Sequence, residues 1–469
     1  MENCPDIKID LSLLEPALRT AVLTVAHLMR DAGGRALIVG GAVRDLLCRK
    51  EVKDVDIEVF GVPPEKLKNA LAAKFNLDLV GMSFGVVKLH HFDIDIALPR
   101  RESKRGIGHK GFDIDADPDL PVPRAAARRD FTVNAIYYDP LTDEIVDPFN
   151  GVGDLENRIL RHVSEKFAED PLRVLRGMQF VARFGFTPAP ETIAVCRAMT
   201  PEDLPPERLF EEWAKLLTKG VRIADGLEFL KATGWVRYYP ELNALIGCEQ
   251  DPKWHPEGDV WTHTCCALDA FARRRDEAGR NREEDLVVGF AVLCHDFGKP
   301  ATTKFEDGHI RSRGHDTAGV APTLSFLRRL TREDRLLREV PPLVEHHMQP
   351  FALWKAHAGD AAVRRLAAKV VRIDRLIRVA HADDEGRPPE CAGGTSAGED
   401  LKWLEETAER LRIAASAPKP ILMGRDLIRL GYRPSPKFSE WLNACFEAQL
   451  DGKFSDLDGA VAYFREHFT

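Results

Sequence analysis

The stretch LIVGGAVRDLLCRKEVKDVDIEV (residues 37–59) decides the fold of the first third of the chain. It predicts a buried strand, a Gly-Gly turn, a helix that begins near residue 42, and a second strand of alternating apolar and acidic residues. Side chains two positions apart on a strand share a face, so Asp54, Asp56 and Glu58 lie together. Carboxylates gathered in this way repel one another unless a cation lies between them. The stretch therefore predicts a cation site on a small sheet.

The Gly-Gly turn supplies a second half to this site. Gly40 and Gly41 let backbone N–H groups approach a phosphate closely, and the start of the following helix favours negative charge. Arg44 is placed to reach phosphate oxygens with its planar guanidinium. Mg²⁺ prefers a few carboxylates together with substrate phosphates. With Asp54 and Asp56 as catalytic carboxylates, the stretch predicts metal-assisted phosphoryl chemistry.

A second acidic strand follows in FDIDIA (residues 92–97). If it pairs beside the first, Asp95 completes the catalytic carboxylates. The alternative is a strand edge whose acidic face meets water.

Around these strands the sequence predicts an α+β chain. A sheet-and-helix head occupies residues 1–160, and the remaining chain is helical: a neck and body (161–254), a histidine-rich region (255–390) and a tail (391–469). The 469 residues are too many for one core.

Composition limits the partners. The net charge is −8, so a nucleic acid has to be held by local basic patches. One candidate is residues 363–381, predicted as a single helix with Arg365, Lys369 and Arg372 along one stripe. Nine cysteines without a CxxC pair and no long apolar run favour a cytoplasmic protein without a membrane partner.

Two further motifs, RRDFTVNAIYYDP (128–140) and EDPLRVLRGMQFVARFGF (169–186), follow the first in order. Together the three resemble the class II tRNA nucleotidyltransferase and bacterial poly(A) polymerase family. The resemblance implies a nucleotidyltransferase head in which Asp54 and Asp56 hold catalytic Mg²⁺. It implies the following nucleotide-binding residues: Gly40, Gly41, Arg44, Arg128, Arg129, Asp130, Asn134, Asp170, Arg173 and Arg176.

Asp170 and Arg173 have a chemical reason to read the base. In CTP and ATP the pairing edge offers an amino donor beside a ring-nitrogen acceptor, which a carboxylate and a guanidinium match. Three residues apart on a helix, the two side chains would share a face. The alternative for Asp170 is a helix N-cap.

Histidines crowd the third region: nine of the fifteen lie between residues 255 and 381. Their order resembles the HD phosphohydrolase domain. That resemblance implies the metal ligands His263, His295, Asp296 and Asp383, with His315 and either His346 or His347 near a second metal or the phosphate. Mixed histidine and carboxylate ligands suit Ni²⁺, Mn²⁺, Co²⁺ or Fe²⁺ better than Mg²⁺. The alternative is a degenerate HD scaffold.

These resemblances predict an enzyme that adds CCA to tRNA from CTP and ATP, with an HD domain that hydrolyses phosphoesters. Poly(A) polymerase, partial addition of CC or A, and an HD hydrolase with a nucleotide-sensing head stay open as alternatives. The sequence leaves the oligomeric state open.

Overall fold

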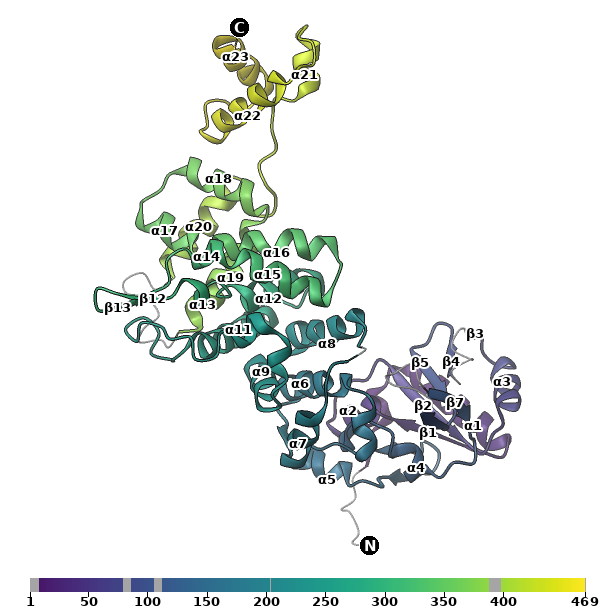
Figure 1. The fold of residues 1–469 in the computed structure, drawn as a ribbon. Helices are drawn as coiled ribbons and strands as arrows, with labels where there is room; N and C mark the ends of the chain where they lie inside the picture. Colours follow the sequence, from purple (N-terminus) through teal and green to yellow (C-terminus); the bar gives the residue numbers. More distant parts are fainter. Residues whose placement is uncertain (1–7, 79–85, 105–111, 203, 388–397, 469) are drawn as a thin grey trace. The chain divides into compact units, whose positions relative to one another are not determined.

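The computed structural model describes residues 8–78, 86–104, 112–202, 204–387 and 398–468 (Figure 1). It divides into two compact units. Unit 1 comprises Met1–Leu209 and Glu228–Trp235, and unit 2 comprises Phe210–Leu227 and Val236–Thr469. Within the described residues, no helix combines the length and the hydropathy that crossing a membrane requires. Seven cysteines of the described part are free thiols.

Unit 1 is organised by a mixed sheet of seven strands in the order β3-β4-β5-β2-β1-β8-β9. The strands are β1 (Arg35–Val39), β2 (Val55–Phe60), β3 (Leu77–Asp78), β4 (Val86–Leu89), β5 (Ile94–Ala97), β8 (Tyr137–Tyr138) and β9 (Ile145–Val146). β1 pairs with β2 antiparallel, whereas β2 and β5 run parallel. The predicted order of buried strand, turn, helix and acidic strand is confirmed, and residues 86–97 contain two short strands.

Helices cover this sheet because their apolar faces need burial. Figure 1 shows α1, α2 and α3 around the strands, and their buried leucines and valines join Ile38, Ile57 and Ile96 in one core. The helices of this part are η1 (Leu11–Leu13), α1 (Pro16–Asp31), α2 (Gly41–Leu47), α3 (Pro64–Ala72), α4 (Val122–Ala126), η3 (Thr132–Asn134) and α5 (Gly151–Glu156). Smaller strands are β6 (Arg100–Lys104), β7 (Phe112–Ala116), β10 (Ile159–Leu160) and β11 (Thr187–Pro188).

The helical segment after the sheet begins as predicted. α6 (Leu172–Phe184) ends at Gly185, whose φ of 66° is the left-handed conformation that glycine adopts without strain. The neighbouring elements are η4 (Glu165–Glu169), α7 (Pro190–Ala198), α8 (Pro206–Lys219), α9 (Ile223–Ala232), η5 (Trp235–Tyr238) and α10 (Pro240–Asn243). The boundary between the two units falls within α8, α9 and η5.

Unit 2 is almost entirely helical, as the sequence predicts. α11 packs against α12 and α19, and α12 also packs against α16 and α19. Its elements are α11 (Val260–Glu277), α12 (Arg282–Cys294), α13 (Lys299–Thr302), β12 (Lys304–Glu306), β13 (His309–Arg311), α14 (His315–Ala318), α15 (Val320–Leu330), α16 (Asp334–His346), α17 (Gln349–Lys355), α18 (Asp360–Val370), α19 (Ile373–Glu385), α20 (Glu399–Arg410), α21 (Gly424–Arg429), α22 (Lys437–Leu450) and α23 (Leu457–Phe468).

The single helix predicted for residues 363–381 is wrong. The chain breaks between α18 and α19, where Val371 has a φ of 64° and Arg372 is extended. Neither residue is a usual helix breaker, so the pattern gave no warning. The proposed basic stripe is also divided: Arg365 pairs with Glu447 and Asp451 on one side of the break, while Arg372 pairs with Asp374 on the other.

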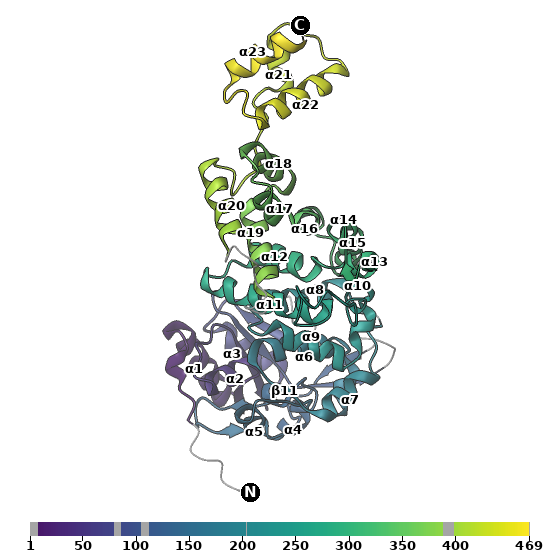
Figure 2. The same ribbon diagram turned by 90° about the vertical axis from the view of Figure 1, so that its left-hand side faces the viewer.

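The end of the chain holds a small core of its own. α21, α22 and α23 lie together in both views (Figures 1 and 2), and Leu427, Cys445 and Phe464 are buried among them. α20 packs instead against α17, α18 and α19. Most of the Pro- and Gly-rich stretch around residue 391 lies outside the described residues.

Candidate functional site

The acidic face of β2 lies directly beside the Gly-Gly turn. Asp56 is the register partner of Val39, the last residue of β1, and a Cβ placed on Gly40 would lie 3.3 Å from Oδ2 of Asp56. Gly40 has a φ of 80°, so this turn needs glycine for its backbone and for the close approach. Asp54 precedes the strand on the same face, and both aspartates are exposed. The structure thus brings the predicted carboxylates and the phosphate turn together.

Asp95 lies beside Asp56, as predicted for the case that the two acidic strands pair. Its strand pairs parallel to β2, with Asp56 and Asp95 as register partners. Neighbouring protein atoms remove water from the Asp56 carboxyl group and so raise its pKa. The charge of Arg129 lowers this pKa, whereas the carboxylates of Asp95 and Asp54 raise it further. Asp95 also forms an ion pair with Lys88 at 2.8 Å, so one cation already balances part of this acidic surface.

Glu58, the third carboxylate of the strand, has a different role. It is 1% exposed and accepts hydrogen bonds from Tyr137 Oη at 2.7 Å and from Arg128 at 2.8 Å. Burial would raise its pKa, but the charges of Arg129 and Arg128 and the tyrosine hydrogen bond lower it. Glu58 therefore fixes the two arginines of the RRDF motif beside the aspartates.

The rest of that motif forms a buried network. Asp130 accepts hydrogen bonds from Asn134 Nδ2 at 3.0 Å and Arg176 Nε at 2.7 Å. Asn134 in turn accepts one from Arg44 at 2.7 Å, and the Arg44 guanidinium lies 4.3 Å above the Phe184 ring. Arg44 is 5% exposed, so the structure anchors it in this network behind the turn.

The predicted placement of Asp170 and Arg173 on one helix is wrong, because α6 begins after Asp170. Asp170 precedes Pro171, the N-cap residue of α6, and its carboxylate accepts a hydrogen bond from the Leu172 N–H at 3.1 Å, a contact close to the N-cap alternative. Its other oxygen pairs with Arg208 at 2.8 Å. Arg173 donates to the Lys166 carbonyl at 2.7 Å and to the Arg128 carbonyl. Arg208, 38 residues further along the chain, gave no signal in the sequence.

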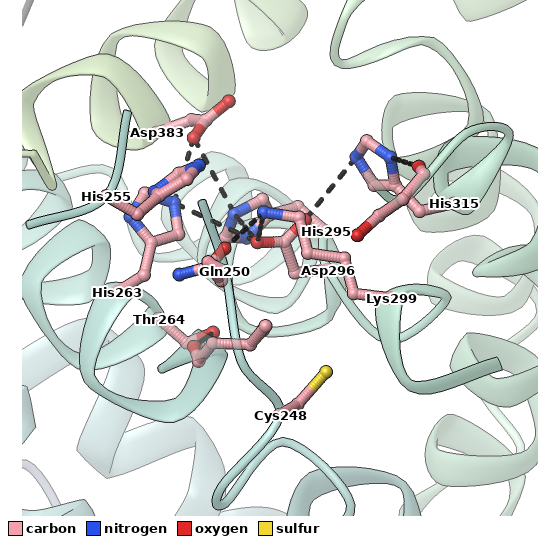
Figure 3. A network of polar contacts seen from close by, with 12 residues as sticks. Cys248, Gln250, His255, His263, Thr264, His295, Asp296, Lys299, His315 and Asp383 are labelled. Carbon is pink, nitrogen blue, oxygen red and sulfur yellow. Dashed lines mark hydrogen bonds and ion pairs between the residues drawn. The ribbon is translucent and has the colours of Figure 1, made fainter. Parts of the chain in front are cut away.

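The second cluster lies within unit 2, where five helices contribute (Figure 3). His263 comes from α11 and Asp383 from α19, while His295 and Asp296 follow directly after α12. His315 begins α14, and His347 follows the last residue of α16. The packing of α12 against α16 and α19 brings these positions together.

Each imidazole of the cluster is oriented by the nitrogen that faces away from it. Nδ1 of His295, His315 and His347 lies 2.7–2.8 Å from the carbonyl three residues earlier. Since a carbonyl only accepts hydrogen bonds, Nδ1 carries a proton, and Nε2, the atom that would bind a metal, faces the cluster. Nδ1 of His263 lies 2.9 Å from the carboxylate of Glu257. Hydrogen bonds of this kind set the tautomer that a metal ligand needs.

The inward-facing atoms of the cluster lie close together. Nε2 of His315 and Nε2 of His347 are 3.2 Å apart, and Nε2 of His263 lies 3.0 Å from Oδ1 of Asp383. Two nitrogens bound at a right angle to one cation, each at about 2.1 Å, would lie about 3 Å apart. The donor set therefore fits a metal ion.

Asp296 lies between two groups of ligands. Asp296 forms one group of potential ligands with His263 and His295, and a second group with His315 and His347. Within each group the ligand atoms lie within 4.8 Å of one another. Asp296 is 1% exposed, and Lys299 Nζ at 2.7 Å and His295 Nε2 at 3.2 Å lie next to its Oδ2 as ion pairs. A buried carboxylate in this state fits a position that bridges two cations.

The charges of the cluster are already arranged for binding cations. Burial would raise the pKa of Asp296 and Asp383, but the surrounding histidines hold both pKa values well below their usual range, and Lys299 adds to this effect at Asp296. Burial lowers the pKa of His347 to about 4, so it is neutral near pH 7. Burial acts against the charged form of His295 as well, but Asp296 and Asp383 outweigh it and raise its pKa to about 8.

The structure separates His346 from His347. His347 is fully buried with its Nε2 beside His315, whereas His346 is half-buried and belongs to none of the described ligand groups.

The sequence did not predict the role of Glu257, since an acidic residue in a loop has no periodic pattern. His255 shares that carboxylate at 2.8 Å. Lys299 also donates to Gln250 at 2.7 Å.

The cluster opens into a cavity of about 800 Å³ within unit 2. Asp296, His315, His347 and Asp383 line one part of it. This volume is typical of a small-molecule site.

Comparisons with known proteins match the head and the helical segment that follows it, and they identify relatives of most of the chain. Residues 36–161 match the family described as "Poly A polymerase head domain", and residues 185–246 match "Probable RNA and SrmB- binding site of polymerase A". A curated protein from Xylella fastidiosa (strain 9a5c), named "Multifunctional CCA protein", is 36% identical over 372 residues, which cover 75% of this chain and 84% of that protein.

Solved structures share the fold. The Bacillus stearothermophilus CCA-adding enzyme in complex with CTP is 23% identical, with a TM-score of 0.65 over 96% of this chain and 98% of that one. The Thermotoga maritima CCA-adding enzyme complexed with tRNA is 17% identical, with a TM-score of 0.61 over 98% and 99% of the two chains.

Proposed function

The chain belongs to the family of multifunctional CCA proteins, and from that premise we propose that it adds C, C and A to the 3′ ends of tRNA, using CTP and ATP. The 3′-hydroxyl oxygen of the RNA bonds to the α-phosphorus, the bond from that phosphorus to pyrophosphate breaks, and the hydroxyl proton is released. The observation that carries the proposal is the contact between Asp56 and the Gly40 turn, with Asp95 in register beside it.

In this proposal the exposed aspartates hold Mg²⁺. The ion, when bound, supplies positive charge at the reacting phosphate. Asp54 and Asp56 are its ligands, with Asp95 as a third carboxylate, while Arg129 lies beside Gly40 where the phosphates of the nucleotide enter. Asp170 and Arg173 read the base edge, and Arg208 positions Asp170 through its ion pair.

The test of this activity is a tRNA that ends before CCA, supplied with labelled CTP, ATP or both. We expect two C additions followed by one A. Long A tails without CTP would instead support a poly(A) polymerase. Addition of CC alone or A alone would indicate a partial enzyme.

We propose that unit 2 carries a second, metal-dependent activity on RNA ends, namely hydrolysis of 2′,3′-cyclic phosphates and 2′-phosphates. A water oxygen bonds to phosphorus and one ribose oxygen leaves, taking up a proton. His263, His295, Asp296 and Asp383 would hold one transition-metal ion. Asp296, with His315 and His347, would hold a second. The close pair of Nε2 atoms at 3.2 Å supports this arrangement.

The neighbouring histidines of α16 give a matched test. The protein is stripped with a chelator and reloaded separately with Ni²⁺, Mn²⁺, Co²⁺, Fe²⁺ or Mg²⁺, and bound metal and phosphate release from adenosine 2′-monophosphate are measured. We expect about two transition-metal ions per chain and activity with a transition metal. His347→Ala should lose one ion, whereas His346→Ala should keep both. Equal losses in the two variants, or a wild type that binds no metal, would contradict the proposal.

We also propose limits for the regions. Because α20 packs against α17, α18 and α19, the hydrolase region extends to about residue 411, and the tail begins with the core around α21–α23. Free thiols in the described part agree with a reducing cytoplasm as the location.

A further inference from the structure

One wall of the unit 2 cavity is apolar. Met348, Phe351 and Trp354 line it, and their spacing of three places them on one face of α17 and the residue before it. His347, the proposed ligand, directly precedes this face in the chain. The apolar face of a short helix normally turns to a core, but Met348 remains 38% exposed. An apolar wall beside a charged cluster is typical of a ligand site.

One aromatic ring of this wall, that of Trp354, packs against a second ring. The Trp354 ring lies 5.8 Å from the ring of Trp403 on α20, at an interplanar angle of 56°. Trp254 lines the same cavity and is 48% exposed, with Lys253 Nζ 5.2 Å above its ring. The cavity therefore offers supported aromatic surface with room in front of it.

Cations line the cavity as well. Lys299, Lys355 and Arg387 contribute to its wall, and Lys355 lies on the same helix as Trp354. Aromatic rings together with lysine and arginine are the combination that binds a nucleobase and its phosphate, because every base has a face that stacks. A phosphoester without a base would leave the apolar wall in contact with water.

We propose that the face of α17 formed by Met348, Phe351 and Trp354 is a nucleobase subsite, so that unit 2 selects nucleoside phosphoesters over phosphoesters without a base. The inference rests on the proposed hydrolase function and names the part of the substrate that the site recognises. Trp354 acts in binding and positioning and takes no part in the chemistry.

The kinetic test compares two cyclic phosphates that differ in the base, 2′,3′-cyclic AMP and glycerol 1,2-cyclic phosphate, on the metal-loaded full chain. We expect a higher kcat/KM for the nucleotide. Trp354→Ala should raise KM for the nucleotide about tenfold, which is the order expected for loss of one stacked base, and change both constants for the glycerol ester less than twofold. Trp354→Phe should restore most of the loss.

Phe305→Ala is the matched control, since Phe305 is 76% exposed on β12 and is not one of the residues that line the cavity. It should leave both substrates unchanged. Equal kcat/KM for the two substrates in the wild type, or equal losses for both in Trp354→Ala, would overturn the inference.

A binding measurement separates this inference from the hydrolase proposal. Calorimetric titration of the metal-loaded chain with adenosine and with inorganic phosphate, the two products of the proposed hydrolysis, needs no turnover. Trp354→Ala should weaken adenosine binding about tenfold and leave phosphate binding unchanged. If neither ester is hydrolysed, the hydrolase proposal fails, and the titration alone decides the base subsite: equal affinity of wild type and Trp354→Ala for adenosine would reject it.

Discussion

The chain has two clusters of acidic side chains, and in each of them neighbouring carboxylates repel one another when no ion is bound. The two clusters differ in how far water can reduce this repulsion. In the head, Asp54 and Asp56 are exposed beside a glycine turn, and water can solvate them when no ion is bound. In unit 2, His263 and His347 are 0% exposed and Asp296 is 1% exposed, so solvent cannot do this.

The difference shows how far each site is built before its substrate arrives. The head keeps its arginines in protein contacts, such as Arg128 on Glu58, and leaves its carboxylates open for ions and a triphosphate. Unit 2 instead orients each imidazole through its outer nitrogen and directs Nε2 inward. In the proposed functions, the exposed site is completed by ions together with its substrate, whereas the buried site is completed by metal ions before the substrate binds.

The largest effect should come from removing one carboxylate from each site. Asp54→Ala should lower nucleotide addition at least about 1,000-fold and leave phosphoester hydrolysis within twofold, because its carboxylate is exposed and its loss costs little folding energy. Asp296→Asn should have the reverse effect. Parallel assays of addition and hydrolysis check this, and loss of both activities in one folded variant would contradict the two-site description.

Because the imidazoles of unit 2 are oriented in advance by hydrogen bonds to their outer nitrogens, we expect a smaller effect on metal affinity from a change at Glu257. Glu257→Gln should weaken metal binding by about 10- to 100-fold, because the carboxylate that orients His263 becomes a neutral amide. Metal titration by calorimetry measures this, with nucleotide addition unchanged. Glu249→Gln, an exposed carboxylate nearby in the chain, is the control; equal losses in the two variants would show that only the overall charge matters.

In the head the corresponding positioning contact is Arg208 on Asp170. Arg208→Ala should lower discrimination of CTP and ATP against UTP and GTP by about tenfold, since one charged hydrogen bond holds the carboxylate. Single-nucleotide incorporation with each of the four triphosphates measures the ratio. A uniform loss with all four would mean that Arg208 serves stability alone.

The smallest expected effect concerns acid stability of the head. Burial would raise the pKa of Asp130, but the Arg176 charge and the hydrogen bonds from Asn134 and Phe131 lower it to about 2, from 3.8. A carboxyl group whose pKa is lower in the folded than in the unfolded protein stabilises the fold at pH values above its unfolded pKa. This stabilisation is lost as the pH falls, here between about pH 4 and pH 2.

By pH 3 the loss from Asp130 should reach about 1 kcal/mol. Asp130→Asn should be less stable at pH 6 and should lose less between pH 6 and pH 3 than the wild type. Urea unfolding at both pH values checks this. The same pH dependence in both proteins would exclude Asp130 as a source.

Local pattern was sufficient for the elements of the head. Alternation in VDIEVF and the glycines before Arg44 predict strand, turn and helix, because each depends on neighbours within a few residues. The break after Val370 was missed, since Val371 has a positive φ and no glycine or proline marks it. Arg208 and Glu257 were missed because each acts on a residue whose position only the folded chain sets.

The sequence by itself determined that this chain has two clusters of acidic residues suited to binding cations, because the residue types and their strand or helix periodicity are local properties. The tertiary structure decided which residues of each cluster lie next to one another. The parallel pairing of β2 and β5 puts Asp95 beside Asp56, and the packing of α12 and α16 selects His347 over His346. A difference of one residue rotates a side chain by about 100° around a helix, and only the packing of that helix fixes which direction faces the metal ligands.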